Sequence, residues 1–400
     1  MRILILTQYF WPENFIINDI ALALKERGHK VYILTAKPNY PHGIFFKGYS
    51  FFFKNNEIWK DIKIYRSPLI PRGRGKGFQL FLNYISFAIF SSVRLLFIFK
   101  KIDKIFVYQP SPVTVGIPGI VAKYRFKAPL YFWVQDLWPE SISAAGGINN
   151  KFVITIFDNL TRYIYRHSKK ILVQSRGFVP YILNQKIDVD KLVYFPNTTN
   201  EFYKPIEAKI ELQKKLPNGI KLMFAGNIGE AQSFDTLLNA AFLLKNENIE
   251  IHWIIIGEGR MKAEVESKLV DLDLVNNFHL LGSFPSYEMP DFFSCADALV
   301  VSLKDNPIFS NTIPSKIQSY LACGKPIIAS LNGEGSRIVT EAKAGFVCNA
   351  EDAFALKESI KSFLLLSSDE RKILGVNGRA YFEQEFSREM LIDKLEQILS

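Results

Sequence analysis

Glycines in the second half of the chain stand where apolar runs end. Gly226 and Gly229 follow the run Lys221–Ala225, and Gly257 and Gly282 follow two later runs. A glycine turn between a strand and a helix lets the backbone approach a ligand closely, and the free N–H groups at a helix N-terminus bind phosphate. Ordinary strand-to-helix turns have the same spacing, so the glycines alone leave both interpretations open.

A serine–lysine pair follows Ile313 and Pro314 and opens a predicted helix over residues 316–323. We expect Ser315 to be the N-cap and Lys316 to add a cation to the first turn. Together they would hold a diphosphate. The alternative for Lys316 is a solvated surface lysine, which the positive end of the helix macrodipole disfavours.

Two carboxylates in the first half are candidates for proton transfer. Asp136 follows the apolar run Leu130–Val134, where a cleft-facing side chain is expected, and it could take a proton from a hydroxyl group. Glu13 follows the first predicted strand. The alternatives are an N-cap or a salt bridge for Asp136 and a solvated loop acid for Glu13, and the sequence does not rank the two residues.

Residues 47–104 are basic and aromatic, with 12 Lys and Arg against three acids. Arg72, Arg74 and Lys76 precede the apolar segment Phe78–Phe99. Cations beside an apolar helix suit an anionic membrane surface, at about 1 kcal/mol per basic residue. They would also suit a lipid diphosphate.

We expect the apolar segment to form a buried or interfacial helix rather than a membrane span. Its Arg94 would cost roughly 2.5–3.5 kcal/mol at the centre of a bilayer. A core helix with a solvated basic loop is the alternative. No RNA-binding module surrounds the Arg–Gly cluster, so nucleic acid is not expected as a partner.

The composition of the 400 residues suits two globular domains, since 48% are hydrophobic and 22% charged. Residues 1–200 carry a net charge of +17 and residues 201–400 one of −7, which indicates that the first half faces an anionic partner. The three cysteines lack CxxC spacing and the five histidines are scattered, so neither a disulfide framework nor a metal site is expected. The first apolar run is too short for a signal peptide.

Short β-branched runs alternate with helical patterns, which is typical of βαβ units and parallel sheets. We predict an α/β fold of two doubly wound, Rossmann-like domains, residues 1–200 and 201–384, with a last helix (385–400) packing back on the first domain. Ligands of such sheets bind at the carboxyl ends of the strands, so two facing domains would hold them in a deep cleft. The predicted strands are 3–7, 30–35, 62–66, 104–108, 130–134, 170–174, 192–195, 221–225, 250–256, 278–281, 298–301, 326–329 and 345–348.

Motifs along the whole chain resemble the GT-B glycosyltransferases of family 4. In the second half these are GNIGEAQ, GEGR, LLGSFP, ADALVVSL, PSK and YLACGKPIIAS, and in the first half LTQYFWPEN, PNYPHG, FWVQDLWPES and VYFPN. The set is similar to the branch that builds bacterial O-antigen and capsule, N-acetyl-L-fucosaminyl transferases in particular. The resemblance implies two facing Rossmann-like domains, the second binding a UDP-sugar and the first an acceptor.

The resemblance also implies which residues bind each substrate. The donor would contact Gly226, Asn227, Gly229, Gln232, Gly257, Gly282, Ser283, Phe284, Asn311, Pro314, Ser315, Lys316 and Ser319. The catalytic candidates remain Asp136 and Glu13, and the acceptor or membrane side would include Asn14, Arg72, Arg74 and Lys76. No cofactor or metal is expected, because helix termini and Lys316 can neutralise the leaving diphosphate.

The sequence departs from the family at two charged pairs. Most members carry a Glu-x7-Glu pair at the donor site, whose places correspond to Asn311 and Ser319, and an Arg and a Lys that correspond to Asn227 and Gln232. Two carboxylates and two cations are lost together, so the local charge stays roughly balanced. How the ribose and the sugar are held, and whether the anomeric configuration is retained, stay open.

We therefore expect a peripheral enzyme on the cytoplasmic face of a bacterial inner membrane. It would move a sugar, such as N-acetyl-L-fucosamine, from a UDP-sugar to a lipid-diphosphate-linked saccharide in O-antigen or capsule synthesis. Catalysis would depend on holding the diphosphate, orienting the acceptor and excluding water. The alternatives are a nucleotide-sugar 2-epimerase of the same fold and, because the Glu pair is missing, a non-catalytic nucleotide-sugar-binding protein.

Overall fold

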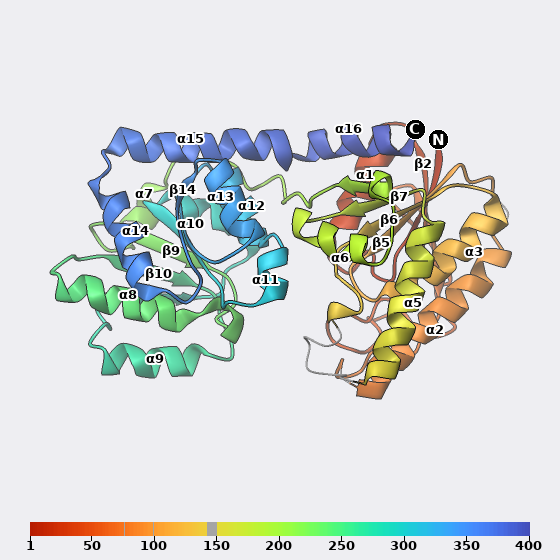
Figure 1. The fold of residues 1–400 in the computed structure, drawn as a ribbon, viewed down its shortest axis with the longest axis horizontal. Helices are drawn as coiled ribbons and strands as arrows, with labels where there is room; N and C mark the ends of the chain where they lie inside the picture. The colour runs from red at the N-terminus through yellow and green to blue at the C-terminus, as the bar shows by residue number, and fades with distance from the viewer. Residues whose placement is uncertain (76, 99, 142–149) are drawn as a thin grey trace. The chain divides into compact units, whose positions relative to one another are not determined.

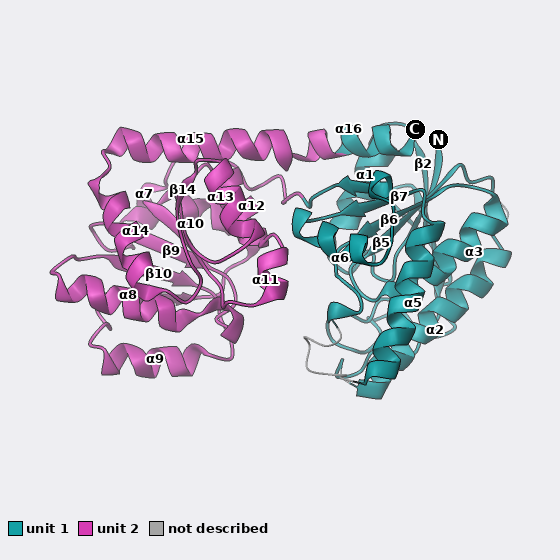
Figure 2. Ribbon diagram, in the orientation of Figure 1, with its two compact units in different colours: residues 1–197, 392–400 teal, residues 198–391 magenta. Residues whose placement is uncertain are grey.

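The computed structural model describes residues 1–75, 77–98, 100–141 and 150–400, which form two compact units (Figures 1 and 2). Unit 1 comprises Met1–Asn197 and Ile392–Ser400, and unit 2 comprises Thr198–Leu391. The first division lies three residues before the expected boundary. The chain returns to unit 1 within the final helix α16 (Arg388–Leu399), later than the expected residue 385.

Unit 1 contains an eight-stranded sheet in the order β3-β4-β2-β1-β5-β6-β7-β8, parallel except for β3. All seven strands predicted for this half are present. The unpredicted strand β3 is a short edge strand that pairs antiparallel with β4, and its two apolar residues, Ile58 and Trp59, are too few to form an apolar run. The strands are β1 (Arg2–Leu6), β2 (Lys30–Ala36), β3 (Asn56–Trp59), β4 (Ile62–Ser67), β5 (Lys104–Gln109), β6 (Leu130–Val134), β7 (Lys170–Val173) and β8 (Leu192–Tyr194), and the helices α1 (Ile16–Glu26), α2 (Gly77–Leu96), α3 (Gly116–Phe126), α5 (Lys151–His167) and α6 (Val179–Asn184).

Unit 2 contains a parallel six-stranded sheet in the order β11-β10-β9-β12-β13-β14. All six predicted strands are present, with ends that differ by two residues at most. The strands are β9 (Lys221–Ala225), β10 (His252–Ile256), β11 (Phe278–Gly282), β12 (Ala298–Ser302), β13 (Ile327–Ser330) and β14 (Gly345–Cys348). The helices are α7 (Ile210–Gln213), α8 (Phe234–Asn246), α9 (Lys262–Asp271), α10 (Met289–Ser294), α11 (Pro307–Asn311), α12 (Ser315–Ala322), α13 (Glu334–Glu341), α14 (Ala353–Leu365), α15 (Ser368–Glu385) and the first turn of α16, which continues into unit 1.

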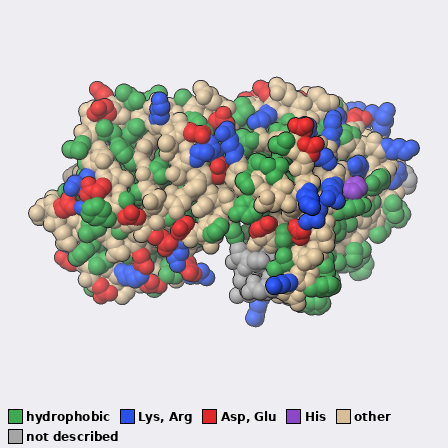
Figure 3. Space-filling model, in the orientation of Figure 1, with side chains coloured by type: hydrophobic (Ala, Val, Ile, Leu, Met, Phe, Trp, Pro, Cys, Tyr) green, Lys and Arg blue, Asp and Glu red, His purple; other side chains and the backbone are tan. Residues whose placement is uncertain are grey.

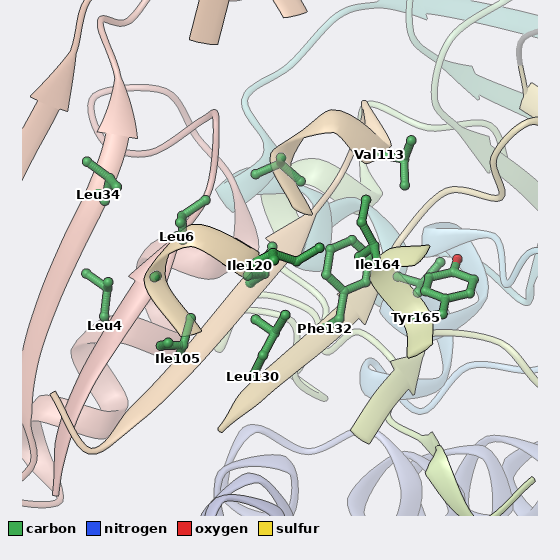
Figure 4. Close-up of a cluster of buried hydrophobic side chains, with 14 of the residues drawn as sticks. Leu4, Leu6, Leu34, Ile105, Val113, Ile120, Leu130, Phe132, Ile164 and Tyr165 are labelled. Atoms are coloured by element: carbon green, nitrogen blue, oxygen red, sulfur yellow. The ribbon is translucent and has the colours of Figure 1, made fainter. Parts of the chain in front are cut away.

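The central strands are mainly apolar because helices cover both faces of each sheet. Every residue of β6 is buried. Figure 4 shows this core in unit 1, where Phe132 of β6 lies near Ile164 of α5. A Cβ at Gly116 of α3 would lie 2.6 Å from Ile164 Cδ1, so only glycine lets these two helices approach so closely.

The strand order reverses between β1 and β5 in unit 1 and between β9 and β12 in unit 2. At such a switch point the loops leave neighbouring strands in opposite directions and open a crevice at the carboxyl ends. The loop with Gly226 follows β9, and the loop with Tyr9 follows β1. The candidate residues of each half thus lie at the edge where a doubly wound sheet binds ligands.

Helix α2 is the one described helix that is long and apolar enough to cross a membrane, with a mean hydropathy of 1.3 over 18 residues. Only 33% of that window is buried. Its buried face includes the polar residues Asn83, Ser86 and Ser91, while the opposite face exposes large apolar side chains. In this structure α2 is a helix packed on one side, as expected for an interfacial helix.

The segment 392–400, which contains most of α16, is held to the rest of unit 1 by the charged groups around His29. His29 Nε2 lies 2.7 Å from Glu396 Oε1, and its Nδ1 lies 3.2 Å from the Met1 amino group. Arg27 forms an ion pair with Asp393 at 2.7 Å. The first and last residues of the chain are therefore held side by side (Figure 1).

Candidate functional site

A cavity of about 600 Å³ lies in unit 2 at the carboxyl ends of β9, β10 and β11. Four segments line it: the turn after β9, the turn after β10, the loop after β11 and the start of α12. The lining includes most of the predicted donor residues, namely Gly226, Asn227, Gln232, Gly257, Ser283, Phe284, Ser315, Lys316 and Ser319. The structure thus brings together residues that are up to 93 positions apart in the sequence.

Two glycines leave the space that the cavity occupies. Gly226 has a φ of +147°, and a Cβ there would lie 2.5 Å from Lys316 Cε. A Cβ at Gly257 would lie 1.9 Å from the Gly226 carbonyl oxygen. A side chain at either position would therefore displace the neighbouring turn or the lysine, which is the physical reason for glycine here.

Lys316 lies on the cavity wall in the first turn of α12. Its ammonium group donates to Gln232 Oε1 and lies 3.7 Å from the ring centroid of Phe224. Neither partner is anionic, and burial lowers the pKa of Lys316 to about 7. The alternative of a solvated surface lysine is wrong. Over the part of the chain that the structure describes, no carboxylate forms an ion pair with this ammonium group.

The start of α12 differs from the prediction by one residue. Pro314, with φ −65° and ψ 128°, is the N-cap, and Ser315 is the first helical residue, so the prediction of Ser315 as N-cap is wrong. Proline fits this end because its fixed φ needs no adjustment and the lost N–H has no helical partner. Ser315 nevertheless lines the cavity.

The two positions of the missing Glu pair differ in their relation to the cavity. Ser319 lines the cavity, and its hydroxyl donates to the Ser315 carbonyl at 3.1 Å and lies 3.1 Å from Thr199 Oγ1. Asn311 lies at the end of α11, where its side chain donates to the Pro307 carbonyl, and it does not line the cavity.

Three further donor candidates lie outside this lining, for reasons of local geometry. Gly282 and Pro314 each stand one residue before a lining residue, and Gly229 lines a separate hollow of about 430 Å³ at the start of α8.

Aromatic and apolar residues that the sequence analysis missed complete the wall. Tyr203 stacks on Phe293 with 6.2 Å between ring centroids, and Phe293 meets Tyr320 edge-on at 5.1 Å. Met289 lines the same cavity. Tyr203 lies just after the predicted boundary at residue 200, and none of the motifs in the sequence analysis included it.

Asp136 follows β6 in unit 1 and is half-buried. Its carboxylate accepts a hydrogen bond from Ser141 Oγ at 2.6 Å, and burial raises its pKa above the usual value, partly offset by the hydroxyl groups of Ser141 and Ser111. Within residues 1–141 and 150–400 as described, this carboxylate is in no ion pair and accepts no backbone N–H bond. Among the described residues, Asp136 therefore acts neither as an N-cap nor as a partner in a salt bridge.

Glu13 is 2% exposed, so its interpretation as a solvated loop acid is wrong. Its carboxylate accepts the backbone N–H groups of Asn39 at 2.9 Å, Tyr40 at 2.8 Å and Phe10 at 3.3 Å. Burial raises its pKa to about 7. Glu13 therefore joins the loop after β1 to the loop after β2 by hydrogen bonds, as a positioning residue does.

The remaining first-half candidates differ in exposure. Arg72 is half-buried beside Tyr9 and Tyr40, whereas Asn14 and Arg74 are exposed. Lys76 lies outside the described residues.

An exposed apolar patch covers α2 and the loop before β3. Phe51 meets Phe90 edge-on at 5.5 Å, and Arg94 donates to Asn56 Oδ1 at 2.8 Å, so this loop lies beside the helix. The α2 patch consists of Phe52, Phe53, Phe78, Phe81, Ile89, Val93 and Leu96. Figure 3 shows hydrophobic side chains gathered over this part of unit 1.

Two family models match the chain one after the other. The glycosyl transferase 4-like domain matches residues 14–198, and the domain of glycosyl transferases group 1 matches residues 206–381. The probable glycosyltransferase WbjE of Pseudomonas aeruginosa is 24% identical over 85% of this chain and 83% of its own. The putative colanic acid biosynthesis glycosyl transferase WcaI of Escherichia coli is 24% identical over 92% of this chain and 91% of its own.

The fold is also that of a solved protein. The crystal structure of Anabaena HepE in complex with UDP has a TM-score of 0.73 and 13% sequence identity, and the match covers 100% of this chain and 99% of HepE. HepE has also been solved with UDP-glucose. This likeness confirms the predicted fold class of two parallel-sheet domains.

Proposed function

Because the chain is a glycosyltransferase of the GT-B fold, with a glycosyl transferase 4-like domain followed by a group 1 domain, we propose that it transfers a sugar from UDP to a lipid-diphosphate-linked saccharide. The similarity to WcaI, a putative colanic acid biosynthesis glycosyl transferase, and to the amylovoran biosynthesis glycosyltransferase AmsK supports a role in polysaccharide synthesis. The cavity around Lys316 is the observation that carries the proposal. N-acetyl-L-fucosamine is the first sugar to test.

The donor diphosphate would bind beside Lys316. This lysine has a lowered pKa, no anionic partner among the described residues, and a place in the first turn of a helix, where N–H groups are free. A diphosphate placed there would favour the protonated ammonium and so raise the pKa. The UDP bound to HepE supports UDP as the carrier.

The aromatic part of the cavity would hold the nucleoside. Phe284, Phe293 and Tyr203 offer ring faces or edges to a flat base, and Ser283 offers a hydroxyl group. Apolar walls with a few polar groups are typical of small-molecule sites.

The transfer itself needs one proton acceptor. As the acceptor hydroxyl oxygen bonds to the anomeric carbon, the bond from that carbon to the diphosphate oxygen breaks and the hydroxyl proton moves to a base. Asp136 suits that role because it is half-buried, unpaired within the described residues, and of raised pKa. UDP leaves as an anion whose charge Lys316 and the helix N-terminus stabilise, so we expect no metal requirement.

The acceptor lipid would place the enzyme on the cytoplasmic face of the inner membrane. The α2 patch would contact the acyl region, and exposed cations near it would contact anionic headgroups. These cations are Lys47, Lys54, Lys60, Arg74, Lys100 and Lys101.

A turnover assay tests the proposal directly. The protein is incubated with UDP-sugars and a panel of lipid-diphosphate-linked saccharides, and an elongated saccharide together with free UDP is expected. A 2-epimerised nucleotide sugar formed without acceptor would contradict transfer, and binding without turnover across the panel would identify a non-catalytic protein.

Vesicle sedimentation tests the membrane contact. The double variant Phe52→Ser/Phe53→Ser is expected to bind vesicles with 30% phosphatidylglycerol at least about tenfold more weakly, because two exposed aromatic side chains are lost. The matched control is Leu365→Ser/Val376→Ser, which changes two equally exposed side chains of unit 2. Equal loss in both variants would contradict the assignment.

A further inference from the structure

The loops after β1, β2 and β4 converge on the side chain of Arg72. Its guanidinium carbon lies 4.8 Å from the ring centroid of Tyr40, and Nη1 lies 3.4 Å from the Tyr9 hydroxyl. Both neighbours are neutral. In the described ranges no carboxylate pairs with Arg72, whereas the fully buried Arg66 forms an ion pair with Glu57. Glu57 thus neutralises the charge of Arg66, whereas no carboxylate in the described ranges neutralises that of Arg72.

The backbone beneath Arg72 is fixed by buried side chains. Its N–H donates to Asn39 Oδ1 at 3.2 Å, and Asn39 is itself held by the Glu13 carboxylate. Asn83 of α2 donates to the Ile70 carbonyl at 2.6 Å. Fixing a long side chain on such a frame costs conformational entropy, and no internal ion pair offsets that cost.

Two glycines bring the supporting loops together. The Gly73 N–H donates to the Gly43 carbonyl at 2.9 Å, and a Cβ at Gly43 would lie 1.7 Å from the Gly73 carbonyl oxygen. Gly43 has a φ of +78° and Gly73 one of +56°. The loop that carries Arg72 is therefore packed directly against the loop that carries Tyr40.

Hydroxyl groups near Arg72 can donate hydrogen bonds, and the candidate base Asp136 lies at the same edge of the sheet. Tyr9 and Tyr84 stay neutral because burial raises their pKa values, so their O–H groups can donate. The Ser111 hydroxyl group lies close enough to Tyr84 and Asp136 to lower the pKa of both. An anion on Arg72 would thus lie on the same carboxyl edge of the sheet as the carboxylate that accepts the proton.

We propose that Arg72 binds a phosphate group of the acceptor, with the Tyr9 and Tyr84 hydroxyls as further donors and Glu13 as the positioning residue of this site. The inference rests on the proposed lipid-diphosphate acceptor. Guanidinium suits the role because its planar fork offers two parallel N–H groups to phosphate oxygens. A membrane phospholipid offers the same chemistry, so the experiment separates the two sources.

The test compares two synthetic acceptors that share one saccharide and one alkyl chain, the first with a diphosphate and the second an uncharged glycoside. Calorimetry without donor measures the affinity for each, so the result does not depend on turnover. Arg72→Gln is expected to bind the diphosphate acceptor about 10- to 100-fold more weakly and the uncharged glycoside within twofold of the wild type. Arg72→Lys, which keeps the charge but loses the fork, should fall between them.

Arg166→Gln, which removes an exposed arginine of α5, is the matched control and should leave both affinities unchanged. Equal loss on both acceptors, or no loss on either, would overturn the proposal. Weaker binding of Arg72→Gln to phosphatidylglycerol vesicles, with unchanged acceptor affinity, would assign the site to a membrane lipid and also overturn it. Thermal unfolding verifies that each variant is folded. If the wild type binds the diphosphate acceptor through Arg72 but never turns over, the proposed function fails while the phosphate site stands.

Discussion

The carboxyl edges of the two sheets are built in opposite ways. In unit 2 the edge is formed by missing side chains, since Gly226 and Gly257 leave room for Lys316, for the neighbouring turn and for the cavity. In unit 1 the edge is formed by side chains from several loops, which hold Glu13, Arg72 and Asp136 in place. One doubly wound architecture thus supports a cavity made by glycine and a cluster made by hydrogen bonds.

The largest effect on turnover is expected at Asp136, the side chain of unit 1 that is proposed to accept the proton. Asp136→Asn keeps the shape but cannot take a proton, so kcat should fall at least about 100-fold while donor affinity stays unchanged. Steady-state kinetics measures kcat, and calorimetry measures the donor affinity. Asp158→Asn, in an ion pair with Arg162 on α5, is the control. Turnover within tenfold of the wild type would remove Asp136 as the base.

A smaller effect is expected at Lys316, which tests the cavity of unit 2. Lys316→Met should weaken UDP binding at least about tenfold, or 1.4 kcal/mol, because it removes the cation beside the diphosphate. In the wild type the pKa of about 7 means that binding takes up a proton above pH 7, so affinity should fall as pH rises from 7 to 9. The variant should lose this pH dependence.

Lys304→Met changes an exposed lysine of the same unit and should bind UDP as the wild type does. An unchanged affinity in Lys316→Met would mean that the diphosphate binds elsewhere.

At Glu13 we expect an effect on stability, because its carboxylate accepts the hydrogen bonds that join the loops after β1 and β2 of unit 1. Glu13→Gln removes an acceptor from buried N–H groups and should lower the free energy of unfolding by about 1 kcal/mol near pH 5. The folded wild type holds a proton that the unfolded chain releases, because the pKa is raised from 4.5 to about 7. Wild-type stability relative to the variant should therefore fall as pH rises through that range. Denaturant unfolding at several pH values measures it, and a difference that grows with pH would contradict the assignment.

The smallest effect is expected from metal removal. Incubation with excess EDTA should leave turnover within about twofold, because Lys316 and the start of α12 are proposed to stabilise the leaving diphosphate. A loss of activity that Mg²⁺ or Mn²⁺ restores would show that a cation shares this work.

The sequence predicted features that depend on local patterns, as in the cavity of unit 2, better than features that depend on contacts between distant loops, as in unit 1. Strand β9 and its glycine turn were predicted to the residue, because an apolar run followed by glycine is a local pattern. The roles of Ser315 and Lys316 followed from their place at the start of a predicted helix, and that of Ser319 followed from motif resemblance. The burial of Glu13 could not be predicted, since it depends on backbone groups 26 and 27 residues away. Tyr203 likewise enters the cavity through tertiary packing that no spacing records.

Since unit 1 includes residues 392–400, its polypeptide is discontinuous. A fragment of residues 1–197 alone would expose the surface that Leu395 and Leu399 bury and would remove the carboxylates of Asp393 and Glu396, which contact Arg27 and His29. Because Met1 and Glu396 both contact His29, a short peptide could join the two ends, and reopening the ring between Asn197 and Thr198 would make unit 1 contiguous. Such a circular permutant would allow unit 1 to be produced and titrated without unit 2.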